Sequence, residues 1–153
     1  MPRVQRSADV TWEGNVARGA GTVSARSAAF AELGFSLPSR IGDVAGKTSP
    51  EELLAAAHAG CYAMSLAGEL AQAGTPPERV VVTATVTLDE VAGGSHRIVA
   101  SDVHARASAD GLDAAELERA AHAADEGCPF SALIKASGTV TVNAELQGGD
   151  DGD

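Results

Sequence analysis

The chain has 153 residues, of which 44% are apolar and only 3% aromatic, which is the composition of one globular domain with an aliphatic core. Its formal net charge of −10 argues against sequence-independent binding to nucleic acid and against binding to an anionic membrane surface, since both require clustered lysine and arginine. No apolar segment is long enough for a signal peptide or a spanning helix, so we expect a cytoplasmic location and no membrane partner.

Short strands separated by glycine turns are predicted for the N-terminal part of the chain. Val10 and Trp12 lie in a first strand that precedes a turn at residues 13–15. Residues 22–24 are the expected hairpin partner of this strand, and a third strand at residues 35–37 is expected to end at Pro38.

A long helix is predicted from about Pro50 to Ala73. Ser49 is suited to the N-cap and Glu52 completes a capping box, while Gly74 ends the helix. The expected buried face consists of apolar and small residues at helical spacing: Leu54, Ala57, Cys61, Met64 and Gly68. The extent of apolar character predicts a helix that is buried on most sides.

The C-terminal half alternates between strand and helix patterns. Residues 79–89 and about 96–107 predict two strands joined at Gly93-Gly94, followed by a helix over 113–125, a short helix from Pro129 and a last strand around 140–146. The order β-β-β-α-β-β-α-β, with strands joined by short turns, predicts an α+β fold of antiparallel strands with two main helices. We expect one domain at residues 1–147 and a disordered acidic tail at 148–153.

Two cysteines carry the most prominent chemistry in the sequence. In a reducing cytoplasm such a pair is more often catalytic, redox-sensing or metal-binding than a permanent cross-link. The cysteines lack the C-x-x-C spacing of a zinc site and the histidines show no ligand spacing, so we expect no metal. No phosphate-binding loop and no nicotinamide or flavin fingerprint is present, so we expect no cofactor.

Local sequence alone favours Cys128 over Cys61 as the nucleophile. A thiol attacks as the thiolate, and burial of Cys61 among Ala, Met and Leu would raise its pKa. Cys128 would instead cap the helix that begins at Pro129, where the helix dipole favours an anion. Cys61 therefore needs a nearby cation to be reactive, and otherwise it is simply a small core residue.

Several short motifs extend through nearly all of the chain. They are Trp12-Glu13-Gly14, Arg18-Gly19, Gly21-Thr22-Val23-Ser24, Thr48-Ser49-Pro50-Glu51-Glu52-Leu53, Ala57-His58-Ala59-Gly60-Cys61, and Gly127-Cys128-Pro129 with Ser131 and Lys135-Ala136. Together they resemble the OsmC branch of the OsmC/Ohr hydroperoxide reductases. The resemblance implies an OsmC-like fold and an intertwined homodimer with its sites at the interface.

The resemblance also implies roles for four residues. Cys61 resembles the peroxidatic cysteine that becomes a sulfenic acid, and Cys128 resembles the resolving cysteine. Arg18 resembles the arginine that stabilises the thiolate and orients the peroxide, and Glu51 the carboxylate that holds this arginine. The resemblance thus supplies the cation that Cys61 lacks and reverses the local preference for Cys128. Arg40 is a rival for the role of Arg18, because it also precedes the long helix.

The position of Glu51 leaves alternatives open. Glu51 and Cys61 are ten residues apart on one helix, which is about 15 Å along its axis. Either Arg18 spans part of this gap or the carboxylate comes from a second subunit, and an acid in a first helical turn also complements the helix dipole. His58, one turn before Cys61, either tunes the thiol or is a core or interface histidine.

We therefore interpret the sequence as a thiol-dependent peroxidase that reduces organic hydroperoxides and, more slowly, hydrogen peroxide. Cys61 is oxidised, Cys128 resolves it as a disulfide, and an external dithiol reduces the disulfide again. The resemblance implies that this dithiol is lipoyl-type or a small molecule. Two alternatives remain, namely a redox sensor and a non-catalytic binder of a hydrophobic small molecule on the same fold.

Overall fold

The computed structural model describes residues 1–42 and 45–148. The chain divides into two compact units, Met1–Leu53 and Leu54–Asp153. Of the tail predicted at 148–153, residues 149–153 lie outside the described residues. Within the described part, no helix is long and apolar enough to cross a membrane.

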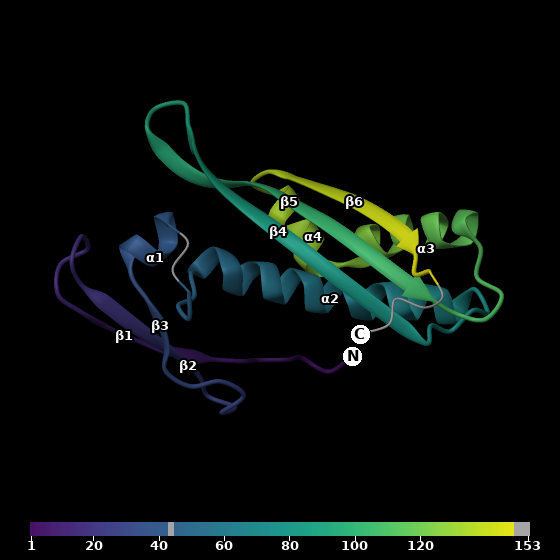
Figure 1. Ribbon diagram of the computed structural model, residues 1–153, viewed down its shortest axis with the longest axis horizontal. Helices are drawn as coiled ribbons and strands as arrows, with labels where there is room; N and C mark the ends of the chain where they lie inside the picture. Colours follow the sequence, from purple (N-terminus) through teal and green to yellow (C-terminus); the bar gives the residue numbers. More distant parts are fainter. Residues whose placement is uncertain (43–44, 149–153) are drawn as a thin grey trace. The chain divides into compact units, whose positions relative to one another are not determined.

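The first unit contains a three-stranded antiparallel sheet in the order β1 (Ala8–Glu13), β2 (Ala20–Ala25) and β3 (Leu33–Phe35) (Figure 1). The predicted hairpin is confirmed, and the third strand lies two residues earlier than expected. Gly21 pairs with Phe35, and a Cβ at Gly21 would lie 2.8 Å from the Phe35 ring. Only glycine fits where the aromatic ring crosses β2.

A short helix that the sequence interpretation missed follows β3. This helix, α1 (Leu37–Ile41), begins after Ser36, whose hydroxyl accepts from the backbone N–H of Ser39 in a capping box. Pro38 is expected to end a strand, but the fixed φ of proline equally suits the first turn of a helix. The capping serine decides between these two roles, and α1 places Arg40 in its last turn.

The remaining elements belong to the second unit, apart from the first turn of the long helix α2 (Pro50–Gln72). They are β4 (Arg79–Val91), β5 (Ser95–Ser108), α3 (Ala114–Gly127), α4 (Pro129–Lys135) and β6 (Thr139–Leu146). β4 and β5 pair antiparallel as predicted, but β6 pairs parallel to β5. The expectation of antiparallel strands is thus wrong for this pair, because α3 and α4 form a crossover that returns the chain in the same direction. The predicted α+β class is confirmed.

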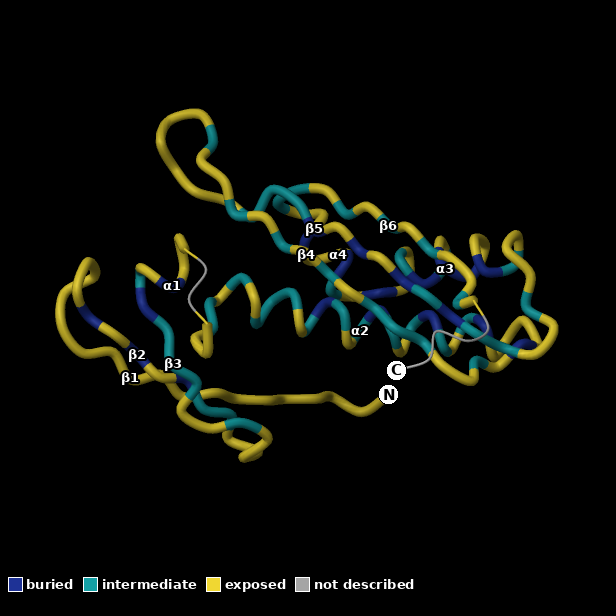
Figure 2. The backbone as a smooth tube through the Cα atoms, in the orientation of Figure 1, coloured by how far each residue is buried: buried dark blue, intermediate teal, exposed yellow. Residues whose placement is uncertain are grey.

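The core of the second unit lies between the sheet and the helices α2 and α3 (Figures 1 and 2). Its buried members are Tyr62, Leu66, Leu70, Val103, Ala105, Ala107, Leu117, Ala120, Ala121, Ala124 and Cys128. Alternate residues of β4 and β6 pack against this cluster, as the period-two patterns predict.

The buried face of α2 differs from the predicted one. The residues that the structure buries at intervals of four are His58, Tyr62, Leu66 and Leu70. Met64, expected to be buried, is 73% exposed, and Gly68 is also exposed. Because α2 carries Ala, Leu and Gly all around its circumference, hydrophobic spacing alone does not identify the face that packs on the sheet.

Candidate active site

Both cysteines belong to the second unit, where the fold brings them together. Cys61 lies in the middle of α2, and Cys128 lies at the junction where α3 ends and α4 begins. Both thiols are free. Cys61 packs against the hydrophobic cluster that contains Cys128, and Cys128 lies near enough to raise the pKa of the Cys61 thiol. The fold therefore places the two cysteines in the same part of the second unit.

The surroundings of Cys61 favour the protonated thiol. Burial is the largest cause of its raised pKa, and the neighbouring Cys128 raises it further through hydrogen bonding and charge. A hydrogen bond from the backbone of Phe130 acts in the opposite direction. Within the second unit, the pKa of Cys61 is therefore raised, as expected from its sequence. A nearby cation is needed to make the thiol reactive at neutral pH.

The exposure of the two cysteine residues differs. Cys61 is partly exposed, whereas Cys128 is only 1% exposed. Cys128 does precede α4 as predicted, but its side chain makes no capping hydrogen bond. Cys61 is therefore the more accessible of the two cysteines to a dissolved oxidant, an effect that the local sequence comparison leaves out.

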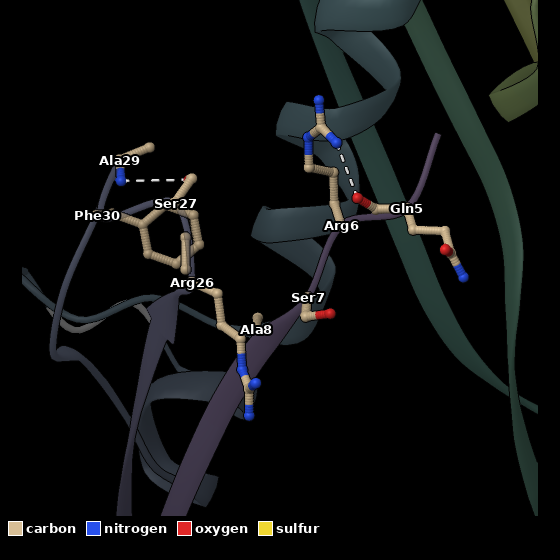
Figure 3. Close-up of a pocket in the computed structure, with 9 residues that line it drawn as sticks. Gln5, Arg6, Ser7, Ala8, Arg26, Ser27, Ala29 and Phe30 are labelled. Carbon is tan, nitrogen blue, oxygen red and sulfur yellow. Dashed lines mark hydrogen bonds between the residues drawn. The ribbon is translucent and has the colours of Figure 1, made fainter. Parts of the chain in front are cut away.

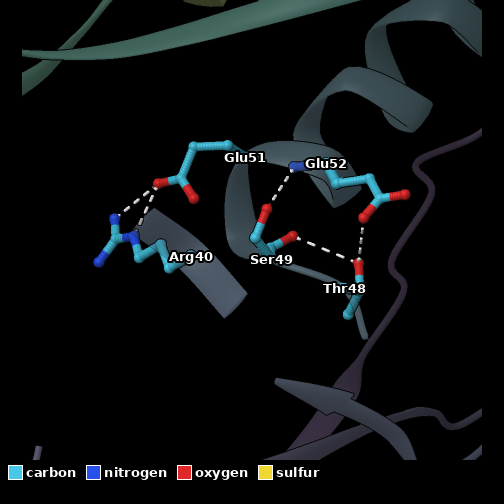
Figure 4. Close-up of polar contacts among 5 residues, drawn as sticks. All are labelled: Arg40, Thr48, Ser49, Glu51 and Glu52. Atoms are coloured by element: carbon cyan, nitrogen blue, oxygen red, sulfur yellow. Dashed lines mark hydrogen bonds and ion pairs between the residues drawn. The ribbon is translucent and has the colours of Figure 1, made fainter. Parts of the chain in front are cut away.

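An ion pair in the first unit joins the two helices on either side of residues 43–44. Arg40, in the last turn of α1, donates to Glu51 Oε1 from both Nε (2.9 Å) and Nη2 (2.6 Å) (Figure 4). Glu51 lies in the first turn of α2. Its other oxygen, Oε2, is buried and accepts no hydrogen bond within the described part of the chain. Glu51 thereby holds the Arg40 guanidinium in a defined orientation.

Arg18 forms no hydrogen bond or ion pair with either member of this pair within the described residues. It is exposed in the connection between β1 and β2, and its backbone N–H donates to Asn15 Oδ1. Among residues 1–42 and 45–148, its side chain has no hydrogen bond or ion pair. Glu51 is expected to hold Arg18, but the structure pairs it with the rival Arg40.

A small apolar cleft adjoins Arg40 within the first unit. It has a volume of ≈ 180 Å³ and is lined by Trp12, Val16, Phe35, Ser36, Leu37, Arg40 and Pro50. The Trp12 and Phe35 rings lie 5.7 Å apart between centroids, at an angle of 43°. The sequence interpretation did not find this cleft, although a tryptophan on an exposed strand is a signal for one.

Comparison with known proteins assigns the chain to a family. The family model described as OsmC-like protein matches residues 42–143. The chain belongs to the OsmC-like protein family. It is 34% identical to the peroxiredoxin OsmC of Escherichia coli over 144 residues, which cover 94% of this chain and 98% of that protein. It is 30% identical to an organic hydroperoxide resistance protein of Xanthomonas axonopodis over 122 residues, covering 78% and 82% of the two chains.

Solved structures of OsmC-like proteins share the fold. The organic hydroperoxide resistance protein OsmC of Legionella pneumophila superimposes with a TM-score of 0.73 at 23% identity, covering 94% of this chain and 99% of that one. An organic hydroperoxide resistance protein from Elizabethkingia anophelis gives a TM-score of 0.74 at 20% identity, covering 96% and 100%.

A second, open cleft of this OsmC-like chain offers no comparable chemistry. It lies between the N-terminal segment and the turn after β2 (Figure 3). Arg6 donates to the Gln5 carbonyl oxygen, and Arg26, another lining residue, forms an ion pair with Asp9. Both cations are exposed, and the described lining contains no thiol.

His58 is a fully buried core residue of the OsmC-like fold. Its Nδ1 lies 2.8 Å from Ser101 Oγ, and its Nε2 lies 2.9 Å from Ser131 Oγ. Burial lowers the pKa of His58, which keeps the imidazole neutral. No group of three or more His, Cys, Asp and Glu side chains suited to a metal ion occurs in the described ranges.

Proposed function

We propose that this protein is a thiol-dependent peroxidase that reduces organic hydroperoxides and, more slowly, hydrogen peroxide. The observation that carries the proposal is the placement of a partly exposed Cys61 beside a buried Cys128. Relatives that are named a peroxiredoxin and an organic hydroperoxide resistance protein support the same class of substrate.

In the first step, the Cys61 thiolate attacks the terminal oxygen of the hydroperoxide. The O–O bond breaks, Cys61 becomes a sulfenic acid, and the alkoxide leaves and takes up a proton as an alcohol. Cys61 is assigned this step because it is the more accessible thiol.

In the second step, Cys128 condenses with the sulfenic acid of Cys61. A sulfur–sulfur bond forms, the S–O bond breaks, and the hydroxyl leaves with the Cys128 proton as water. An external dithiol, of the lipoyl type or a small molecule, then returns both cysteines to thiols and is itself oxidised to a disulfide. No bound cofactor is needed in this cycle.

The activating cation is assigned to an arginine held by Glu51. Arg40 is the better supported candidate, because Glu51 accepts two of its hydrogen bonds. Arg18 remains the alternative that the family resemblance implies. A guanidinium near the thiolate offsets the effect of burial on the pKa of Cys61, and its planar fork orients a peroxide at the same time.

A turnover assay with cumene hydroperoxide and a dithiol tests the proposal. The wild type should turn over repeatedly, and Cys61→Ser should abolish turnover while leaving the fold intact. Cys128→Ser should consume one equivalent of peroxide and leave a sulfenic acid on Cys61, which mass spectrometry detects.

Three outcomes would contradict parts of this scheme. A first oxygen on Cys128 would invert the two roles. A disulfide that forms once but is not turned over would favour the redox sensor, in which the disulfide changes the binding of a partner. A wild type whose thiols do not react with peroxide would favour the non-catalytic binder.

A further inference from the structure

A buried hydrogen-bond network links the segment that carries Cys128 to the helix that carries Cys61. His58 of α2 bonds through Nδ1 to Ser101 of β5 (2.8 Å) and through Nε2 to Ser131 of α4 (2.9 Å). All three side chains are fully buried. One imidazole therefore connects three elements of the second unit at a single point.

The hydrogen-bonding capacity of the imidazole is fully used by this network. A neutral imidazole has one donor and one acceptor nitrogen, and each serine hydroxyl can serve as the complement of either. Both ring nitrogens of His58 are thus satisfied, which leaves none for a thiol or a peroxide. This geometry therefore argues against a role for His58 in proton transfer at the cysteine sulfur atoms.

The network lies next to both cysteines along the chain. His58 precedes Cys61 by three residues on α2, and Ser131 follows Cys128 by three residues in the first turn of α4. Residues three apart on a helix lie on the same side of it. The bond between His58 and Ser131 therefore fixes α4, just beyond Cys128, against the helical turn that carries Cys61.

Two other polar contacts near the junction of α3 and α4 do not join α2 to α4. Asp125 and Lys135 form an ion pair of 2.6 Å, which joins α3 to α4 but does not reach α2. The Tyr62 hydroxyl donates to the Ala121 carbonyl (2.9 Å), which joins α2 to α3 before the chain reaches Cys128. Among the hydrogen bonds between two side chains in residues 45–148, only that of His58 with Ser131 joins α2 to α4. The backbone of Phe130 also reaches α2, but its partner there is Cys61 itself.

We propose that His58 is a positioning residue for disulfide formation, which acts through Ser131 to hold Cys128 within reach of oxidised Cys61. This inference rests on the proposed function, because it concerns the second step of that cycle. The condensation of thiol with sulfenic acid releases water and needs no further oxidant. Its competitor is a second molecule of hydroperoxide, which oxidises the waiting sulfenic acid to a sulfinic acid.

The inference predicts that the two chemical steps respond differently to one mutation. Ser131→Ala removes the hydroxyl that ties α4 to His58 but leaves Cys61 and its surroundings on α2 in place. Oxidation of Cys61 should keep its rate, whereas disulfide formation should slow about tenfold or more, as expected when reacting groups are no longer held in place. With excess peroxide, the fraction of sulfinic Cys61 should rise.

The experiment is a single-turnover reaction of the reduced protein with cumene hydroperoxide. Samples are quenched with a thiol-alkylating reagent and a sulfenic-acid trap, and mass spectrometry counts thiol, sulfenic, sulfinic and disulfide forms over time. Tyr62→Phe is the matched control, because it also removes one buried hydrogen bond made by α2, but to α3. This control should form the disulfide at the wild-type rate. Ser131→Thr, which keeps a hydroxyl, should restore most of the rate.

The outcomes separate the inference from the proposed function. A wild type that forms no disulfide contradicts the proposed function, and the inference with it. A wild type that forms the disulfide while Ser131→Ala does so equally fast overturns the inference alone. The inference also fails if both steps slow equally in Ser131→Ala, or if Tyr62→Phe slows disulfide formation as much, since either result indicates a general loosening of the fold.

Discussion

The reactivity of Cys61 depends on opposing effects at one sulfur atom. Burial and Cys128 raise its pKa, and only a backbone hydrogen bond from Phe130 opposes them within its own unit. An opposite charge at close range typically lowers a pKa by about 1–3 units. Arg40→Ala should therefore raise the pKa of Cys61 and reduce its alkylation rate at neutral pH by about tenfold or more. Part of the rate should return at higher pH, as the thiolate forms.

The measurement is the alkylation rate against pH for the wild type, Arg40→Ala and Arg18→Ala. Arg40→Lys should rescue poorly, because an ammonium group lacks the planar fork with which Arg40 meets Glu51. If Arg18→Ala shifts the thiol titration while Arg40→Ala leaves it unchanged, the activating role belongs to Arg18.

His58 makes folding stability dependent on pH. Its pKa is lowered in the folded protein, mainly by burial, while Asp125 raises it and Lys135 lowers it by charge. The unfolded chain therefore binds a proton at His58 more readily, with a pKa of about 6.5. The contribution of the neutral imidazole is present above that pH and is lost as the pH falls below it.

Urea unfolding between pH 7.5 and 5 checks this prediction. The midpoint of the wild type should fall toward acid more steeply than that of His58→Gln, whose side chain does not titrate but can still bond to one of the two serines. Equal slopes for the two proteins would show that other groups dominate the acid sensitivity.

Some features of the helices and strands could be predicted from local sequence, and others could not. The long helix, the hairpins and the helix capped by Asp113 were predictable, because caps, glycines and periodicity are local signals. The face of α2 that packs on the sheet, the direction of β6 and the partner of Glu51 depend on tertiary packing instead. Arg18 and Arg40 both precede α2 in the chain, and only α1 brings one of them to Glu51.

The helix α1 yields a prediction at the same scale, because it carries Arg40. Ser36→Ala removes the side-chain acceptor at its N-cap and should cost about 0.5–2 kcal/mol of stability. It should also slow the alkylation of Cys61, though less than Arg40→Ala, since the ion pair with Glu51 remains. Urea unfolding and the alkylation assay measure the two effects.

Asp113→Ala is the control, since Asp113 accepts at the N-cap of α3 through a bond of the same kind (2.8 Å). It should lower stability by a similar amount and leave the alkylation rate of Cys61 unchanged. If Ser36→Ala and Asp113→Ala slow alkylation equally, the effect is one of general stability, and α1 has no special part in placing Arg40.

At the scale of the whole molecule, a single chain leaves too much apolar surface in water. All six residues of β1 are exposed, including Val10 (60%) and Trp12 (37%). Met64 of α2, Ile41 of α1 and Leu133 of α4 are also exposed. Exposed apolar side chains that gather into one patch usually mark an interface.

We therefore expect an obligate homodimer that buries more than about 2,000 Å² in total, the range of permanent interfaces. Sedimentation equilibrium at micromolar concentration should give twice the chain mass, and dilution should lower the unfolding temperature, because folding and association are linked.

A dimer would also allow Glu51 and Arg40 of one subunit to serve Cys61 of the other. Mixing Arg40→Ala with Cys61→Ser under conditions that exchange subunits tests this directly. If each site combines Arg40 of one subunit with Cys61 of the other, one of the two sites in every mixed dimer contains both wild-type residues. If both residues come from the same chain, neither site does. Recovered turnover thus indicates that the site is completed across the interface, and no recovery indicates that it is completed within one chain. A stable folded monomer in sedimentation would refute the dimer itself.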